Sequence, residues 1–266
     1  MTVVHTLASG SSGNALVVLS GGTRILLDAG VSCRRITASL AELGMGPGDL
    51  DAILITPTHT DHISGLRTLL KRTDAPVWAT ARTGRDLLYR LPEAEDRLCP
   101  AEPGVPFEVG GCTVTAVAAS HDAPGACGYR LDTADGSVGI LTDTGYVTDQ
   151  AAELLPGVDL AVLEANHDVE ALRSGPYPYY LKQRILGPEG HLSNTDAAAF
   201  AVTLAERGAG EIVLAHLSRE NNTPAMARTA VETALAAAGW GPLLSVAPRD
   251  TLGPAHVVDR RSVCRR

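Results

Sequence analysis

The feature that most constrains the fold is a series of short apolar runs, each ending at a turn residue or a polar side chain. Runs such as DAILITP (51–57) and VDLAVLEAN (158–166) are rich in β-branched residues and too short for buried helices, so they predict buried strands. Helical spacing follows such runs, for example at 32–43 and at 194–208. The alternation predicts an α/β fold.

The same order of elements occurs twice along the chain. The first half opens with three short strands and the helix at 32–43, and strand–helix units follow. In the first of these units, the strand at 51–57 precedes a helix at 62–72. The second half opens with β-hairpins at 107–119 and 128–145, and strand–helix units follow again. No linker rich in proline, glycine or serine separates the halves. We therefore expect a single domain of residues 1–266 on two sheets, with a tail that frays from about residue 254.

Charge and composition exclude several classes of protein. The net charge is −8, whereas a protein that mainly coats nucleic acid is usually basic. The amino terminus lacks a basic segment followed by a long apolar run, and no segment approaches the roughly 20 apolar residues of a membrane span. The five cysteines form no CxxC pair. These features predict a cytoplasmic protein with reduced thiols and no membrane contact.

Four histidines and two carboxylates follow the predicted strands, at the position where α/β enzymes usually carry their chemistry. A single buried histidine is usually structural, but six nitrogen and oxygen donors at strand ends indicate a metal site. Imidazoles and carboxylates without cysteine suit zinc, manganese or iron. The six candidate ligands are His59, Asp61, His62, His121, Asp143 and His216.

The segment TPTHTDH (56–62) allows two cations. Adjacent Asp61 and His62 can face one cation while His59 points to another, and a later carboxylate, Asp143, can bridge the two. Two residues before His59, where a first ligand would be expected, stands Pro57. Proline has no side-chain donor, so one of the two sites lacks a ligand.

Six further motifs stand out along the chain: ASGSSGNA (8–15), LTDTGYV (141–147), EANHDVEAL (164–172), GPYPYYLKQRIL (175–186), GHLSNTDAA (190–198) and AHLSRENN (215–222). These motifs resemble the YycJ/WalJ family, bacterial relatives of ribonuclease Z with the metallo-β-lactamase fold. The similarity covers roughly residues 3–248 and implies a four-layer αββα sandwich, here a single metallo-β-lactamase-like domain, with a dinuclear metal cleft at one edge. The resemblance implies one metal on His59, His121 and Asp143, weakened by Pro57, and a strong site on Asp61, His62, Asp143 and His216. The metal would be zinc or manganese.

Other candidate residues have two interpretations each. We take Asp61 and His191 as catalytic. The resemblance implies that His191 lies at the cleft, although it could simply pack at a helix entry. The loop SGSSGN (9–14) can cradle a phosphate through backbone N–H groups or form only a tight turn, with Ser11 and Asn14 as candidate substrate contacts. His167 is a candidate substrate contact and a possible replacement ligand for the first metal.

Segment 173–186 interleaves three tyrosines with Arg173, Lys182 and Arg184. Tyrosine can stack on bases while arginine and lysine meet phosphates, so this segment is a candidate nucleic-acid contact. The alternative is a proline-ordered loop packed on the edge of the sandwich.

The leading hypothesis is a metal-dependent phosphodiesterase acting on nucleic acid, in which a metal supplies hydroxide to attack phosphorus. The resemblance implies DNA as the substrate, 5′→3′ exonuclease action and a role in replication or repair. One alternative is a small-molecule hydrolase of esters, thioesters or cyclic phosphates on the same fold. Another is a non-catalytic, metal-poor binding protein in which Pro57 marks lost activity.

Overall fold

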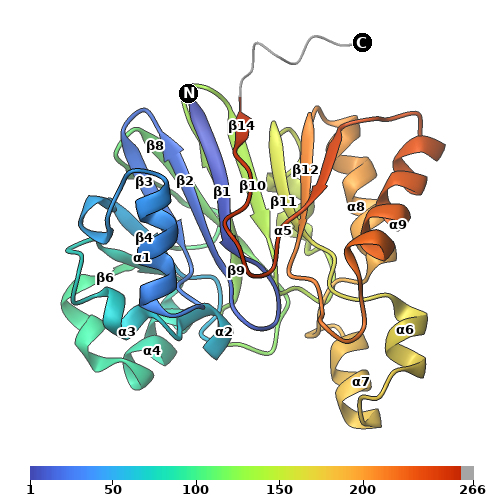
Figure 1. Ribbon diagram of the computed structural model, residues 1–266, viewed down its shortest axis with the longest axis horizontal. Helices are drawn as coiled ribbons and strands as arrows, with labels where there is room; N and C mark the ends of the chain where they lie inside the picture. Colours follow the sequence, from blue (N-terminus) through green and yellow to red (C-terminus); the bar gives the residue numbers. More distant parts are fainter. Residues whose placement is uncertain (259–266) are drawn as a thin grey trace.

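A computed structural model describes residues 1–258 of the chain. Two seven-stranded sheets stack face to face, and helices cover the outer face of each sheet (Figure 1). The expected four-layer αββα sandwich is therefore confirmed. In each sheet, hairpin-connected antiparallel strands lead into parallel strands joined by helices, which explains why the sequence shows the same order of elements twice.

Each sheet has antiparallel strands on one side and parallel strands on the other. The first runs β14-β1-β2-β3-β4-β5-β6 and the second runs β13-β12-β11-β10-β9-β8-β7. The strands of the first sheet are β1 (Thr2–Ala8), β2 (Ala15–Ser20), β3 (Thr23–Leu27), β4 (Ala52–Leu54), β5 (Val77–Ala79), β6 (Leu98–Pro100) and β14 (His256–Val258). Those of the second are β7 (Pro106–Val109), β8 (Cys112–Ala118), β9 (Cys127–Asp132), β10 (Ser137–Leu141), β11 (Leu160–Glu164), β12 (Glu211–Ala215) and β13 (Leu243–Val246).

Three apolar cores hold the four layers together. Successive side chains of a strand point to opposite faces, so Val162 joins the core between the sheets while Leu163 packs towards the outer helices. The outer helices are α1 (Cys33–Glu42), α3 (Leu66–Leu69) and α4 (Ala81–Arg90) on the first sheet, and α5 (Asp149–Leu154), α8 (Asn194–Glu206) and α9 (Pro224–Ala237) on the second. The continuous apolar runs of the sequence are these strands, buried on both faces.

The single helix expected at 62–72 is wrong. The structure has two short helices, α2 (Thr60–Ile63) and α3, separated at Ser64 and Gly65. The Gly65 N–H donates to the carbonyl of Ala29 at 2.8 Å, and the Ser64 hydroxyl donates to the carbonyl of Gly30 at 2.7 Å. The loop after β3 therefore takes backbone and side-chain bonds at the point where the helix breaks.

The expectation of a frayed end from about residue 254 fails for His256–Val258. These residues form β14, which pairs antiparallel with β1, and His256 Nδ1 lies 2.6 Å from Glu211 Oε1 of β12. Residues 259–266 of the expected tail lie outside the described part of the chain.

We predict that Gly30→Ala destabilises the fold by about 3 kcal/mol, because a Cβ on Gly30 would lie 1.6 Å from the carbonyl oxygen of Asp61. Urea unfolding would measure the loss. Gly48→Ala is the matched control, since its Cβ would meet nothing closer than the Arg72 carbonyl oxygen, at 3.9 Å. Equal stabilities for the two variants would contradict the close approach.

Candidate metal centre

The six candidate ligands converge at the ends of strands from both sheets. His59 caps the amino terminus of α2, after β4, and His121 follows β8. Three residues other than glycine have left-handed backbone in residues 1–258: Asp28, Asp143 and His216, with φ of 60°, 55° and 56°. Such backbone is strained for these residue types, and it occurs here only directly after β3 and shortly after β10 and β12. These turns direct Asp143 and His216 towards the other candidate ligands, and Asp28 towards the far side of the His62 ring.

The four ligands expected at the strong site lie together. His62 Nε2 is 3.0 Å from Asp143 Oδ2 and 3.6 Å from Asp61 Oδ2. His216 Nε2 is 3.5 Å from Asp61 Oδ2 and 3.7 Å from Asp143 Oδ1. A tetrahedral cation with bonds of about 2.1 Å holds its ligands roughly 3.4 Å apart. Asp61, His62 and His216 thus form one potential donor group, and Asp143 contacts both of its histidines.

The ligands expected at the first site also meet. His121 Nε2 lies 3.2 Å from His59 Nδ1 and 3.5 Å from Asp143 Oδ1, so Asp143 faces both groups. Asp122, which the sequence analysis missed, joins this group, and its Oδ1 lies 3.2 Å from His59 Nε2. Its position directly after His121 was the available signal.

Two further carboxylates missed by the sequence analysis orient the histidines. Asp28 Oδ2 lies 2.8 Å from His62 Nδ1, and Glu164 Oε1 lies 2.7 Å from His216 Nδ1 and 2.9 Å from His191 Nδ1. An ionised carboxylate accepts from Nδ1–H, which leaves Nε2 of His62 and His216 unprotonated for a metal. Both carboxylates end apolar runs, RILLD and LAVLE, and this position could have identified them.

The electrostatics of the cleft favour a cation. Burial alone would lower the pKa of His216, but Asp143, Asp61 and Glu164 outweigh it and raise the pKa to about 10. Burial would raise the pKa of Glu164, yet His191 and His216 lower it to about 2. The buried carboxylates thus require positive charge nearby, which protons on the histidines or a divalent ion can provide.

The residues also fit a metal in their hydrogen bonding. His216 Nε2 and Asp143 Oδ2 are buried and have no partner with hydrogen-bond geometry within residues 1–258, although Asp143 Oδ2 is paired with His62 Nε2 at 3.0 Å. Buried polar atoms without partners are rare, and here both point towards the other donors of the strong site. A divalent metal would satisfy both atoms.

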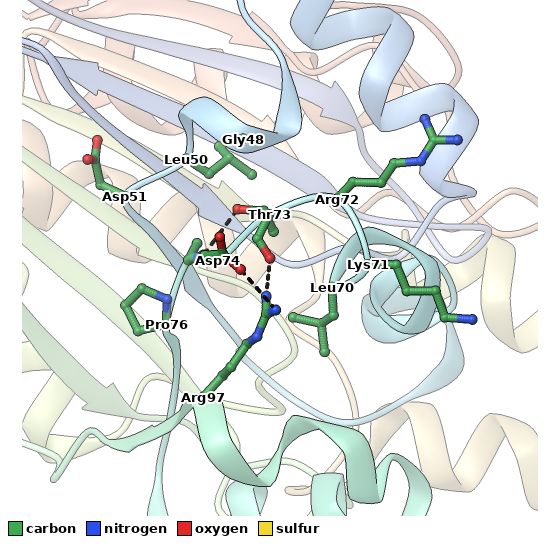
Figure 2. A pocket seen from close by; sticks show the side chains of 11 residues that line it. Gly48, Leu50, Asp51, Leu70, Lys71, Arg72, Thr73, Asp74, Pro76 and Arg97 are labelled. Carbon is green, nitrogen blue, oxygen red and sulfur yellow. Dashed lines mark hydrogen bonds and ion pairs between the residues drawn. The ribbon is translucent and has the colours of Figure 1, made fainter.

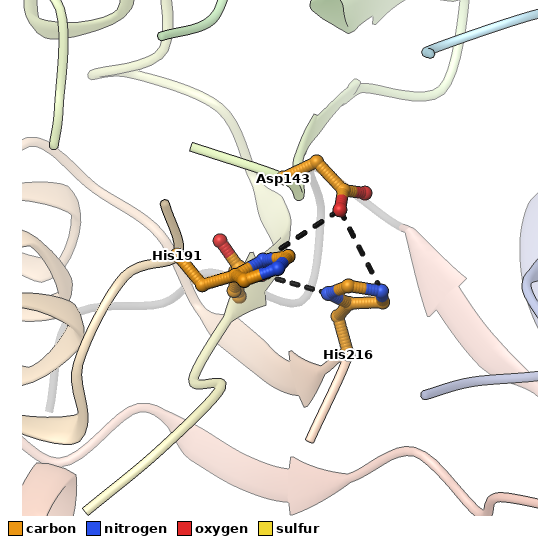
Figure 3. Close-up of side chains that lie close together, drawn as sticks. Asp143, His191 and His216 are labelled. Carbon is orange, nitrogen blue, oxygen red and sulfur yellow. Dashed lines mark hydrogen bonds and ion pairs between the residues drawn. The ribbon is translucent and has the colours of Figure 1, made fainter. Parts of the chain in front are cut away.

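His191 lies beside the metal ligands and next to a pocket. Figure 3 shows Asp143, His191 and His216 converging, and the His191 ring also packs 4.9 Å from that of His121. The adjacent pocket is lined by loops that connect strands of both sheets and by helix α7 (Tyr179–Leu186). Its lining includes Ser11, His121, Tyr177, Arg184 and His191. The candidate substrate contact Ser11 therefore faces the same cleft as His191.

The loop at 9–14 is tied to the site by its last residue. The Asn14 side-chain nitrogen lies 3.1 Å from His62 Nε2, and the Asn14 backbone N–H donates to the Asp61 carbonyl at 2.8 Å. The N–H groups of Gly10 and Gly13 bond within the loop, whereas Ser11 and Ser12 are exposed. Only part of the expected phosphate cradle is therefore open to a ligand.

His167 does not reach the cleft. Its side chain is buried behind the site, with 1% of the residue exposed, and burial lowers its pKa to about 4. Its carbonyl accepts from the Asn194 N–H at 2.8 Å, which holds the segment in place. Among the described residues, His167 belongs to no potential donor group and does not line the pocket beside His191, so its roles as a substrate contact or a replacement metal ligand stay predictions.

Segment 173–186 forms the end of helix α6 (Val169–Ser174), a loop at 175–178 with two prolines, and all of α7. Both helices project beyond the second sheet (Figure 1). Tyr179 and Tyr180 are exposed. The three cations have local partners: Arg173 pairs with Glu170 at 3.1 Å, Lys182 donates to the Arg173 carbonyl at 2.7 Å, and Arg184 pairs with Asp122 at 2.5 Å.

A larger hollow of about 600 Å³ lies elsewhere (Figure 2). It is lined by residues between Gly48 and Arg97, and Arg97 pairs with Asp74 across it at 3.2 Å. None of its lining residues belongs to a metal-donor group, so its size does not mark the site.

Comparisons with known proteins agree with this geometry. The family model of the beta-lactamase superfamily domain matches residues 23–217. Exodeoxyribonuclease WalJ of Streptococcus pneumoniae is 40% identical over 240 residues, 88% of each chain, and Exodeoxyribonuclease YycJ of Bacillus anthracis is 35% identical over 88% of this chain and 89% of its own. The metallo-beta-lactamase fold protein YhfI of Bacillus subtilis superposes with a TM-score of 0.71 at 17% identity, covering 97% of this chain and all of its own.

The fold and the donor groups thus define a metallo-β-lactamase-type hydrolase. Within that superfamily, the chain belongs to the family of WalJ and YycJ, as its motifs suggested. This membership supports a metal-dependent enzyme over a non-catalytic, metal-poor binding protein. Among residues 1–258, no helix has the length and apolar character needed to cross a membrane.

We predict that Glu164→Gln weakens metal binding about 10–100-fold. The carboxylate accepts hydrogen bonds from several N–H groups, and the amide of Gln would place its own N–H groups against these donors. Besides the two imidazoles, its Oε2 accepts from the backbone N–H groups of Thr144 and Leu192, at 3.0 and 3.1 Å. Competition with a chromophoric chelator measures the change. Glu206→Gln, at the exposed end of α8, is the control, and equal affinities in the two variants would refute the orienting role.

Proposed function

We propose that this protein is a metal-dependent exodeoxyribonuclease that removes nucleotides from the 5′ end of DNA and serves replication or repair. The observation that carries the proposal is a pair of donor groups beside an open pocket, with Asp143 in contact with histidines of both. The groups are His59, His121 and Asp122, and Asp61, His62 and His216. The names of WalJ and YycJ support DNA as the substrate, and the resemblance of the motifs to that family supports the 5′→3′ direction. The same resemblance supports zinc or manganese as the metal.

Metals held by these residues would polarise the phosphate and bring the pKa of a water to about 7. Asp61 contacts the two histidines of the strong site, and a quarter of its side chain is exposed to solvent in the cleft. His191 donates Nδ1–H to Glu164, so its Nε2 can pass a proton to the leaving oxygen of the DNA. Glu164 stabilises the protonated imidazole during this step.

The DNA end would occupy the pocket beside His191. Tyr177 offers a ring on which a terminal base can stack, and Ser11 offers a hydroxyl for a phosphate. The exposed Tyr179 and Tyr180, together with Arg173 and Lys182, extend this surface along α6 and α7. In an acidic chain this surface supplies the local positive charge that DNA needs.

We expect the purified protein to shorten end-labelled, 5′-phosphorylated duplex DNA from its 5′ end when manganese or zinc is titrated in. His216→Ala should abolish this activity, because His216 carries a donor of the strong site. Running the variant alongside separates the chain's own activity from a contaminating nuclease. Intact DNA at every metal concentration, with turnover of a thioester or cyclic phosphate instead, would establish the small-molecule alternative.

We further expect His191→Ala to slow DNA cleavage about 100–10,000-fold while the bound metal per chain stays unchanged. Loss of a general acid matters least when the leaving group needs no proton. Cleavage of bis(p-nitrophenyl) phosphate should therefore be affected much less than cleavage of DNA. Equal losses on both substrates, or loss of metal, would show that His191 supports the site and does not transfer a proton.

A further inference from the structure

Asp122 occupies a position that the ligand pattern leaves open. Pro57 removes a donor from the first site, and the remaining expected ligands there are His59, His121 and Asp143. Asp122 Oδ1 lies 3.2 Å from His59 Nε2 and 3.4 Å from His121 Nε2, and the three side chains form one potential donor group.

Three donor atoms lie close to His121 Nε2, two of them from residues of its potential donor group. Its neighbours are His59 Nδ1 at 3.2 Å, Asp122 Oδ1 at 3.4 Å and Asp143 Oδ1 at 3.5 Å. Ligands of a tetrahedral zinc ion with bonds of about 2.1 Å lie roughly 3.4 Å apart. Asp122 Oδ1 therefore lies at a distance from His121 Nε2 that suits a further donor to the same ion.

The Asp122 carboxylate is aimed at this group by contacts on its other side. Arg184 Nε lies 2.5 Å from Oδ2, and the Asp122 backbone N–H donates to the Glu189 carbonyl at 3.1 Å. His121 is anchored to the same segment, with Nδ1 2.9 Å from the Gly190 carbonyl oxygen. Oδ1 is therefore left facing the two imidazoles.

The loop that carries Pro57 keeps its place without a metal-binding side chain there. The Thr56 hydroxyl donates to Asp28 Oδ2 at 2.6 Å, and the Thr58 hydroxyl donates to Asp86. These bonds on both sides of the proline hold His59 where it can meet Asp122.

We propose that Asp122 is a ligand of the first metal and replaces the donor missing at Pro57, with Arg184 as the positioning residue that orients it. The proposal rests on the metal-dependent function above, but not on the identity of its substrate. It makes the first site a two-histidine, two-carboxylate site. It also removes Arg184 from the surface available to DNA.

The test counts metal ions instead of measuring activity. Apo-protein is loaded with Mn²⁺ or Co²⁺, desalted and analysed for bound metal per chain, and the Co²⁺ absorption bands report the ligands. We expect two ions in the wild type and one in Asp122→Asn, whose first-site Kd rises by more than about 100-fold, since losing a ligand exceeds the 10–100-fold cost of losing an outer partner. Arg184→Gln should raise that Kd about 10-fold.

Two further variants make the test specific. Pro57→His combined with Asp122→Asn should restore the second ion, because the histidine returns a donor to the same site. Glu189→Gln removes an equal charge from the pocket beside His121 and should keep both ions, because Glu189 contacts Asp122 only through its backbone carbonyl.

The ion left in the strong site shows that Asp122→Asn is folded. A wild type that holds one ion, or Asp122→Asn with two ions at wild-type affinity, overturns the proposal. Two ions in the wild type, one in Asp122→Asn and intact DNA would leave the ligand assignment standing and refute the nuclease.

Discussion

The buried carboxylate of Asp143 is the constraint on which the rest of the cleft depends. It lies within 3.7 Å of nitrogens from four histidines: His62, His121, His191 and His216. A carboxylate removed from water is costly unless charge and hydrogen bonds compensate it. Its pKa is held well below its usual range, because the surrounding imidazoles outweigh burial. Both donor groups are therefore arranged around one negative charge.

The sandwich matters because neither sheet can build the cleft alone. His59 and His62 follow a strand of the first sheet, whereas Asp143 and His216 follow strands of the second. Carboxylates at the ends of β3 and β11 fix the rings from behind, and the apolar core between the sheets sets the distance across which the rings meet. Packing far from the cleft thus controls the spacing of its donor atoms.

Much of the site could be predicted from sequence, because a polar residue after an apolar run lies at a sheet edge whatever the rest of the chain does. His121 and His216 are examples. Asp122 could not be assigned, since its orientation depends on Arg184, which is 62 residues away. Likewise, the break at Gly65 depends on Ala29, in a distant loop, and helical spacing gave no sign of it. His167 has the right chemistry, but burial keeps it from the cleft.

The left-handed turns at Asp28, Asp143 and His216 have a consequence for the amount of protein in a cell. Each strained residue lowers the stability of the folded state by about 1–3 kcal/mol. The buried His216 nitrogen without a partner lowers it further. A ligand that binds only the native state offsets such costs in proportion to its free concentration. Chains that fail to acquire metal would open more often and be degraded first, so metal scarcity would deplete the protein itself as well as its activity.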